Sequence, residues 1–320
     1  MNHLYTQVMH HNEAQVLIDI EYFVMYARTQ QVSFERFLPQ LIRNLTLFHP
    51  MYQPERDYAA SLAVFIALKH HVDQHLGHCH YTQLYNVEQD VIVQFYQLLL
   101  GDESLFENER EQTINQHMAN LHGIQLYLRG VVNQHHRLLA VRVDLHYQVQ
   151  CLHQVNITTF HSDIQLLLSS LGKQTNCFTE IVGYVWSLGQ RVEYGGYYIR
   201  LLLLVNGSKY SDAWHMIART GQCWHDITQG EGYAFNPYEI EQLQYLQEQG
   251  RLEPGIIYSN NPKLCQRVFD CGTELVKQEN PLRVKLSSTM HTFGWGHMGI
   301  VKWRGNDDRT YNDDLSGWAV

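Results

Sequence analysis

Residues Ile181 to Gly207 read IVGYVWSLGQRVEYGGYYIRLLLLVNG and hold the strongest strand signal of the chain. Aromatic and β-branched residues fill both arms, and Glu193-Tyr194-Gly195-Gly196 between them supplies the backbone freedom of a tight turn. The second arm ends in an unbroken apolar run, residues 201–205, which is typical of a strand covered on both faces. The stretch therefore predicts a β-hairpin at the centre of a sheet.

A further strand is predicted upstream of the hairpin, where helical periodicity gives way to strict alternation. Every second residue of 139–147 is apolar, and Arg142, Asp144 and His146 alternate with these residues. One face of this strand is therefore apolar and the other polar. The polar trio can line a site; alternatively, it meets water or holds Arg142 and Asp144 in an ion pair.

The first 130 residues predict a mainly helical region, because apolar residues recur there at spacings of three and four. Proline and glycine interrupt the pattern and separate one helix from the next. The expected helices cover Glu13–Thr29, Ser33–Phe48, Glu55–Leu76, Val87–Leu100 and Gln112–Leu128, the last of which ends at Gly130.

The remaining elements are helices that flank the sheet, a loop at residues 229–236 with two glycines, and one short strand. The expected helices cover 162–171 with a cap at Ser162-Asp163, 210–228, 237–249 and 262–276, and the strand covers 255–259. The sequence thus predicts an α+β fold. A mainly helical region of residues 1–130 precedes an antiparallel sheet with flanking helices in residues 131–304, and a polar acidic tail occupies residues 305–320.

Composition narrows the class of protein. The 320 residues are 45% apolar, which is enough for a large core, and no apolar run reaches the roughly 18 residues that cross a bilayer. The N-terminus lacks a basic-then-apolar leader, so we expect a soluble, cytoplasmic protein with no membrane partner. The net charge of −9 comes from residues 1–130 and the tail, which disfavours tight nonspecific DNA binding. The six cysteines are scattered without a C-x-x-C pair, which predicts neither a disulfide framework nor a cysteine zinc site.

A histidine cluster lies in the helical region. It consists of His70, His71, His75, His78 and His80, next to Cys79. The four-residue spacing of His71 and His75 would suit a metal on one helix face. Histidine is frequent throughout this chain, however, and a solvated histidine surface is the alternative, so we assign no metal ligands here.

The order of elements and several short motifs resemble the inovirus (filamentous phage) gene II-type family of replication proteins and its prophage relatives of the YagK/YfjJ type. The resemblance covers roughly residues 131–304. It rests on the hairpin, on a Trp-bearing helix after it, on the strand VRVDLHY at 141–147, on the loop GEGYAFN at 230–236, and on the late segment from Lys277 to Thr292-Phe293-Gly294.

The resemblance implies the fold and chemistry of rolling-circle replication initiators. In such enzymes two histidines, separated by one residue on a central strand, hold a divalent metal against the scissile phosphate. A tyrosine on a nearby helix attacks the phosphorus, and a lysine three residues after it helps to place the phosphate. The metal acts as a Lewis acid and the tyrosinate as a nucleophile.

This chain departs from the family at the catalytic positions. Where relatives read Gly-Tyr-His-x-His-Leu, it has Tyr198 and Arg200 in place of the histidines, and where they read Tyr-x-x-Lys, it has Glu274 and Lys277. A phenol is a poor ligand at neutral pH, and a guanidinium cannot ligate a metal because it stays protonated. No cofactor is therefore expected; Mg²⁺ or Mn²⁺ would be required only if nicking activity is retained.

Three functions fit this pattern. The first is a catalytically degenerate initiator-like protein that still binds single-stranded or hairpin DNA. The second is an active nickase with a rebuilt site, for instance with Tyr198 as nucleophile beside Arg200. The third is a protein-interaction or regulatory factor that acts through the acidic helical region. For the first function, the predicted DNA-binding residues are Arg142, Arg200, Lys277, Arg283 and Lys285, with stacking by Trp186, Tyr197 and Tyr198.

Overall fold

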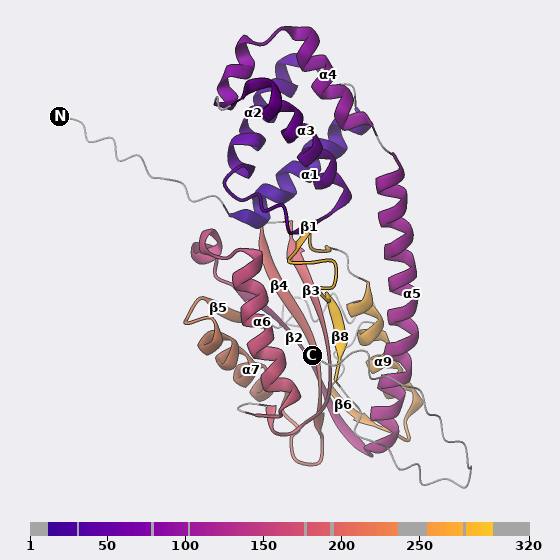
Figure 1. The fold of residues 1–320 in the computed structure, drawn as a ribbon. Coiled ribbons are helices and arrows are strands. Elements are labelled where there is room, and N and C mark those ends of the chain that lie inside the picture. Colours follow the sequence, from indigo (N-terminus) through magenta and orange to yellow (C-terminus); the bar gives the residue numbers. More distant parts are fainter. Residues whose placement is uncertain are drawn as a thin grey trace, which may run out of the picture.

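The computed structural model describes residues 12–30, 32–77, 80–101, 103–175, 178–192, 195–235, 255–277 and 280–296. It confirms the predicted α+β fold: a helical N-terminal region stands at one end of an antiparallel sheet that has helices on both faces (Figure 1). None of the helices in these ranges is both long and apolar enough to cross a membrane.

Four α-helices and a short 3₁₀ helix build the N-terminal region. The predicted first helix is confirmed residue for residue, and the third begins later than expected because Asp57–Tyr58 forms a strand, β1. Pro39 lies inside the second helix and does not end it. The elements are α1 (Glu13–Thr29), α2 (Phe34–Phe48), α3 (Ala60–Leu76), η1 (Tyr81–Asn86) and α4 (Gln89–Leu100).

Helix α5 (Glu103–Gln134) is much longer than the predicted segment 112–128 and continues through Gly130. Its C-terminal third buries apolar side chains such as Leu128 and Val131 against the sheet and a later helix. This burial outweighs the cost of a helical glycine, about 1 kcal/mol. The expected boundary between residues 130 and 131 therefore falls inside a continuous helix that runs along one side of the molecule (Figure 1).

The predicted hairpin is confirmed as β3 (Ile181–Arg191) and β4 (Gly196–Asn206), and β4 is the central strand. The strand β2 (Arg137–Tyr147) pairs with the other edge of β4, and β8 (Phe293–Trp295) pairs with β3. The order is β5-β2-β4-β3-β8, and every pairing is antiparallel.

Two short strands complete the sheet on the free edge of β2. The strand β6 (Gly255–Tyr258) confirms the predicted strand. The prediction of a loop over residues 229–236 was wrong in its second half, because β5 (Gly232–Phe235) hydrogen-bonds along β2 from Asp144 to Tyr147. The free edge of β2 offers unpaired backbone groups that favour such pairing. The two glycines in this segment suggested a loop instead.

Besides α5, three α-helices within the described residues flank the sheet. The predicted helix at 162–171 was placed too late: α6 (Ile157–Gly172) begins at Asn156, whose side-chain oxygen accepts hydrogen bonds from the backbone N–H groups of Thr158 and Thr159. The short helix η2 (Val149–Gln154) precedes it. Helix α7 (Ala213–Ile227) lies within its predicted range, and α9 (Pro262–Val276) matches its prediction. The helix predicted at 237–249 and the tail at 305–320 lie outside the described residues.

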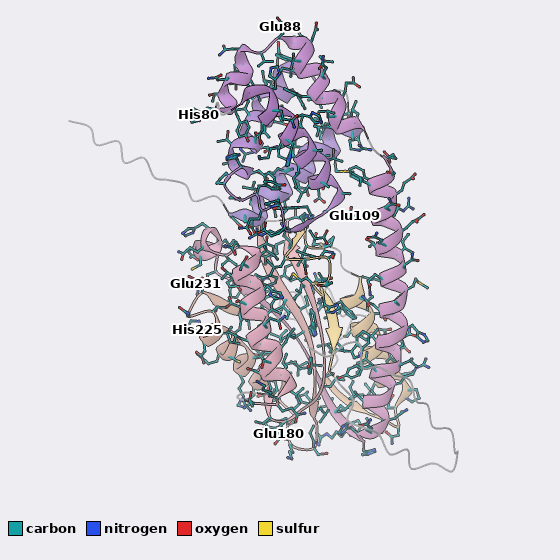
Figure 2. The ribbon with its side chains drawn as sticks, viewed as in Figure 1. His80, Glu88, Glu109, Glu180, His225 and Glu231 are labelled. Atoms are coloured by element: carbon teal, nitrogen blue, oxygen red, sulfur yellow. The ribbon has the colours of Figure 1, made fainter. Side chains whose placement is uncertain are left out.

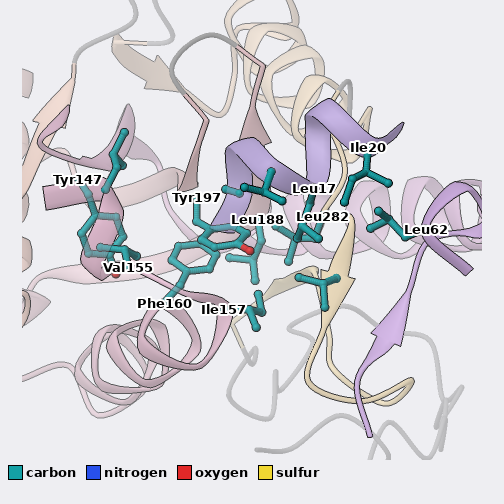
Figure 3. Close-up of a cluster of buried hydrophobic side chains, with 14 of the residues drawn as sticks. Leu17, Ile20, Leu62, Tyr147, Val155, Ile157, Phe160, Leu188, Tyr197 and Leu282 are labelled. Atoms are coloured by element: carbon teal, nitrogen blue, oxygen red, sulfur yellow. The ribbon is translucent and has the colours of Figure 1, made fainter. Parts of the chain in front are cut away.

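The central strand is buried on both faces, as its apolar run predicts. Leu201, Leu203 and Val205 join the core beneath α6 and α7, whereas Leu202 and Leu204 join a second cluster beneath α5 and α9. The first cluster continues without a break into the helical region. In Figure 3, Leu17 of α1 lies close to Tyr197 and Leu188 of the hairpin.

A buried carboxylate ties α1 to the hairpin. Glu13 forms an ion pair with Arg56 at 2.7 Å, and its Oε1 accepts hydrogen bonds from the Tyr197 hydroxyl at 2.8 Å and from the backbone N–H of Ile157 at 2.7 Å. The glutamate therefore lies at the N-terminus of α6, where a negative charge is favourable. One side chain of α1 thus fixes the hairpin and α6 together.

A second tie uses Gln190 of β3 and Arg283. The Gln190 amide donates to the Ala14 carbonyl at 2.7 Å and accepts from the backbone N–H of Arg283 at 3.0 Å. The Arg283 guanidinium in turn donates to Glu21 of α1 at 2.7 and 2.9 Å. Nearby, β1 pairs with β7 (Val284–Lys285), so a segment of the helical region and a segment from the chain's far end share a small sheet.

Candidate functional site

The catalytic positions of the resemblance come together on one face of the sheet. In the antiparallel register His146 lies opposite Tyr198, and Asp144 lies opposite Arg200. Directly opposed residues project to the same face, and this is the face that α5 and α9 cover (Figure 1). Together with Glu274 of α9, the polar residues of this face form what we call the polar cluster: Arg142, Asp144, His146, Tyr198, Arg200 and Glu274.

Ion pairs connect the polar cluster from α9 to β4. Arg142 donates from Nη1 to Glu274 Oε2 at 2.9 Å, and its Nε lies 3.6 Å from Asp144 Oδ1. Arg200 Nε lies 3.8 Å from the other oxygen of Asp144. Burial raises the pKa of Asp144, and the charges of Arg142 and Arg200 act in the opposite direction. The ion pair of Arg142 with Asp144 is therefore present, and it extends to Arg200 and Glu274.

His146 lies among aromatic rings. Its ring stacks on Tyr233 with centroids 5.6 Å apart, and Tyr198 lies on another side at 5.5 Å. Burial, together with the charges of Arg191 and Arg200, lowers the pKa of His146 to about 3. The imidazole is therefore neutral at physiological pH.

The Tyr198 side chain is buried in the protein and not exposed to solvent. Only 5% of it is exposed, and the guanidinium of Arg200 stands over its ring, 5.1 Å from the centroid. The ring covers Gly189 of β3 so closely that a Cβ at Gly189 would overlap it. A hydroxyl held in this way is poorly placed to attack a phosphate of an incoming DNA strand.

Several polar atoms of the cluster remain unsatisfied. Asp144 Oδ1, His146 Nδ1 and Arg200 Nε are buried and form no hydrogen bond to any residue that the structure describes. Most buried polar atoms in proteins are paired, and the exceptions often mark a place for water or a ligand. The cluster thus contains a donor, an acceptor and an imidazole nitrogen that can each still form a hydrogen bond.

The described residues offer no ready metal site. No group of three or more His, Cys, Asp or Glu side chains within them is placed to hold an ion. In the histidine cluster of the helical region, His70 contacts the Tyr52 hydroxyl at 3.2 Å and His75 packs edge-on against Phe95. His78 lies outside the described residues.

Two predicted DNA-binding residues have other contacts in the structure. Tyr197 projects to the opposite face and is 1% exposed, with its ring stacked on Phe160. Arg283 is buried in its ion pair with Glu21. Base stacking by Tyr197 is therefore incompatible with this fold, because its ring is buried against Phe160, and phosphate binding by Arg283 would require it to leave Glu21.

The other predicted positions are spread over the molecule. Trp186 lies opposite Leu201 and so projects away from the polar cluster. Lys285 pairs with Asp57 at 3.0 Å in the small sheet of β1 and β7. Lys277 is exposed at the C-terminal end of α9, within one turn of Glu274. Only Arg142, Tyr198, Arg200 and Glu274 of the predicted set lie together, and Lys277 stands at their margin.

Asp144 and His146 belong to the cluster, as the predicted polar trio of this strand allowed, although only Arg142 of the trio was predicted to bind DNA. The signal that finds them is the alternation of β2 combined with its register against β4. Tyr233 carried no signal, because its role depends on β5 pairing with β2.

Comparisons of the chain with protein-family models, with curated proteins and with solved structures find no match in any of the three.

Proposed function

We propose that the protein is a replication-initiator-like, single-stranded or hairpin DNA-binding protein whose catalytic positions hold an ion-pair network in place of a metal and a nucleophile. The observation that carries the proposal is the 2.9 Å contact between Glu274 and Arg142. Through this contact α9, which carries the family's nucleophile position at Glu274, lies against the sheet face that carries the family's metal positions at Tyr198 and Arg200. A nicking enzyme requires this juxtaposition, which supports the resemblance although neither reactive group is present.

The chemistry of the cluster argues against retained nicking. Arg200 stays protonated and cannot ligate a metal. Glu274 replaces the attacking tyrosine and is engaged by Arg142, and Tyr198 is buried beneath Arg200. Each group that would have to react is held in a charge or stacking contact.

The same cluster is suited to a phosphate group. A guanidinium pairs with phosphate in the geometry it uses for carboxylate, so a DNA phosphate can replace Glu274, whose side chain is 34% exposed, on Arg142. Lys277 stands exposed beside it, and Tyr233 offers a half-open ring at the sheet edge. Because the local positive charge is modest, we expect weak and salt-sensitive binding.

The first test is an electrophoretic shift with a DNA hairpin that carries a single-stranded flank, at low and at moderate salt. Lys277→Ala should weaken binding and reduce the slope of log K against log salt concentration by about 1, as expected for one lost phosphate contact. Lys173→Ala is the matched control, because Lys173 is likewise an exposed lysine just after a helix but belongs to α6 on the other face. Absence of any shift at low salt, or equal loss in both variants, would overturn the proposal.

The second test concerns chemistry. With Mg²⁺ or Mn²⁺ the protein should leave the hairpin uncut and form no covalent adduct. An adduct that disappears in Tyr198→Phe would establish the rebuilt nickase instead. Restoring the family pattern with Tyr198→His, Arg200→His and Glu274→Tyr together should produce metal-dependent nicking if the alignment of the motif positions is correct.

A protein-interaction role is the second candidate, and one observation favours it. A cavity of about 470 Å³ opens between α1 and α2, and exposed Tyr22 and Tyr26 line it together with Arg36 and Arg43. A photo-crosslinking residue in place of Tyr22 should then capture a partner in cells, whereas one in place of Leu166, equally exposed on α6, should not. DNA binding that survives without any such adduct speaks for the first function.

A further inference from the structure

Helix α5 carries a side that faces away from the rest of the molecule. Its buried residues all lie between Ile124 and Val132, and its earlier turns run along the outer edge (Figures 1 and 2). On the inner side Glu109 accepts a hydrogen bond from the backbone N–H of Ala60 at 3.0 Å, and Glu103 pairs with Arg28. The opposite side makes no such attachment to residues that the structure describes.

A regular seam runs along the flank of α5, beside its buried residues. Residues spaced alternately by four and three form a line along the helix, and the line continues into the buried core at Leu128 and Val132. Its middle is apolar, with Ile114 51% and Met118 61% exposed, whereas Leu121 is partly buried against the core beneath α5 and α9. The seam, as defined here, consists of Glu107, Glu111, Ile114, Met118, Leu121 and Gln125. Such spacing is typical of a helix that packs against another helix.

The charges along the seam are unequal. Its N-terminal end carries Glu107 and Glu111, which lie one turn apart and repel each other. Near its C-terminal end, His122 and Arg129 are exposed on nearly the same side. Glu107 and Arg129 form no ion pair with any described residue of their own chain. An acidic end and a basic end on one helix match a second copy of the same helix in the antiparallel direction.

We propose that α5 pairs with α5 of a second copy of this chain, antiparallel, about a two-fold axis near Met118. In that register Met118 meets the partner's Met118, and Ile114 meets the partner's Leu121, so apolar residues meet apolar residues. Glu107 then lies level with the partner's Arg129, about 33 Å along the helix from its own Arg129. A two-fold axis repeats each contact, as in most homodimers.

The size of the seam sets the strength of the dimer. Three apolar side chains from each copy bury less area than the roughly 1,600 Å² of a typical stable interface. The dimer should therefore dissociate on dilution, and salt should weaken it because the flanking charges are exposed.

The test is sedimentation equilibrium of the full chain over a range of protein concentrations. Met118→Asp should weaken the dimer by about tenfold or more, as loss of a central buried contact does. Leu126→Asp should leave it unchanged, because Leu126 is 54% exposed on the same helix but lies off the seam. Circular dichroism of both variants verifies that these surface changes leave the fold intact.

Charge reversal tests the direction of pairing. Glu107→Arg and Arg129→Glu should each weaken the dimer, because each places like charges level across the two-fold axis, and the double variant should restore it. In a parallel pair the double variant would give no rescue. A protein that stays monomeric at every concentration, a dimer insensitive to Met118→Asp, or a failure of the double variant to recover would overturn the proposal and assign the seam to a different partner.

Discussion

His146 is a buried ionisable residue whose surroundings make the stability of the protein depend on pH. It lies between Tyr198 and Tyr233, with the charges of Arg191 and Arg200 nearby, and its pKa falls from 6.5 to about 3. The unfolded chain thus binds a proton near pH 6.5 that the folded protein excludes until about pH 3. The stability that neutral His146 contributes is therefore fully present above pH 6.5 and is lost as the pH falls towards 3.

His146→Phe should remove this dependence, since phenylalanine keeps a ring between the two tyrosines but binds no proton. Between pH 6.5 and 4 the free energy of unfolding of the unaltered protein should fall more steeply than that of the variant, by about 1.4 kcal/mol per pH unit. Urea denaturation across this range measures both. His71→Phe, at an exposed histidine of α3, should keep the original slope, and parallel profiles for all three proteins would contradict the assignment.

At the scale of single elements, the hairpin depends on the absence of a side chain at Gly189. The Tyr198 ring occupies the space that a Cβ there would need. Gly189→Ala should therefore cost about 1–3 kcal/mol of unfolding free energy, as overpacking does. Gly172→Ala at the end of α6, where a Cβ would only touch the Tyr184 hydroxyl at 3.7 Å, should be neutral or slightly stabilising.

A double-mutant cycle separates this contact from general strand effects. In a Tyr198→Ala background the cost of Gly189→Ala should shrink, because the atom it strikes is gone. A cost that persists unchanged would mean that the strand itself, and not the ring, rejects alanine.

The elements show why the fold was largely predictable and the site only partly. Helix α9 and the hairpin follow from local periodicity and turn chemistry, which the chain expresses within a few residues. The start of α6 was misplaced because the Asn156 cap is a single residue without a flanking pattern. The side chains of the polar cluster depend on the register of β2 against β4, and Tyr233 depends on an edge pairing, neither of which is encoded locally.

The roles of Tyr197 and Arg283 were missed for a related reason. Both residue types often bind nucleic acid when exposed, and the sequence gives no sign that α1 covers them. Whether an aromatic or basic residue is available is decided by contacts between segments far apart in the chain. The residue types of a strand or helix therefore do not indicate which of their side chains remain free.

At the scale of the whole molecule, the helical region and the sheet share one core. A single apolar cluster extends from α1 to α7, and Glu13 and Gln190 link α1 to the hairpin through buried hydrogen bonds. Breaking a buried ion pair such as Glu13–Arg56 from one side is expected to cost about 3–5 kcal/mol. A loss of that much unfolding free energy at α1 should therefore destabilise the sheet as well.

The two regions should therefore unfold together. All six tryptophans lie at or after Trp186, so tryptophan fluorescence reports on the C-terminal part, whereas far-ultraviolet circular dichroism reports mainly on the helices. The two signals should give coincident urea transitions, and Glu13→Gln should shift both to lower urea by the same amount. Asp19→Asn, which removes the partly buried partner of exposed Arg43, should shift neither by more than about 1 kcal/mol. Separate transitions, or a fluorescence transition that ignores Glu13→Gln, would mean that the sheet is stable without α1 and that the boundary near residue 130 divides two independent folding units.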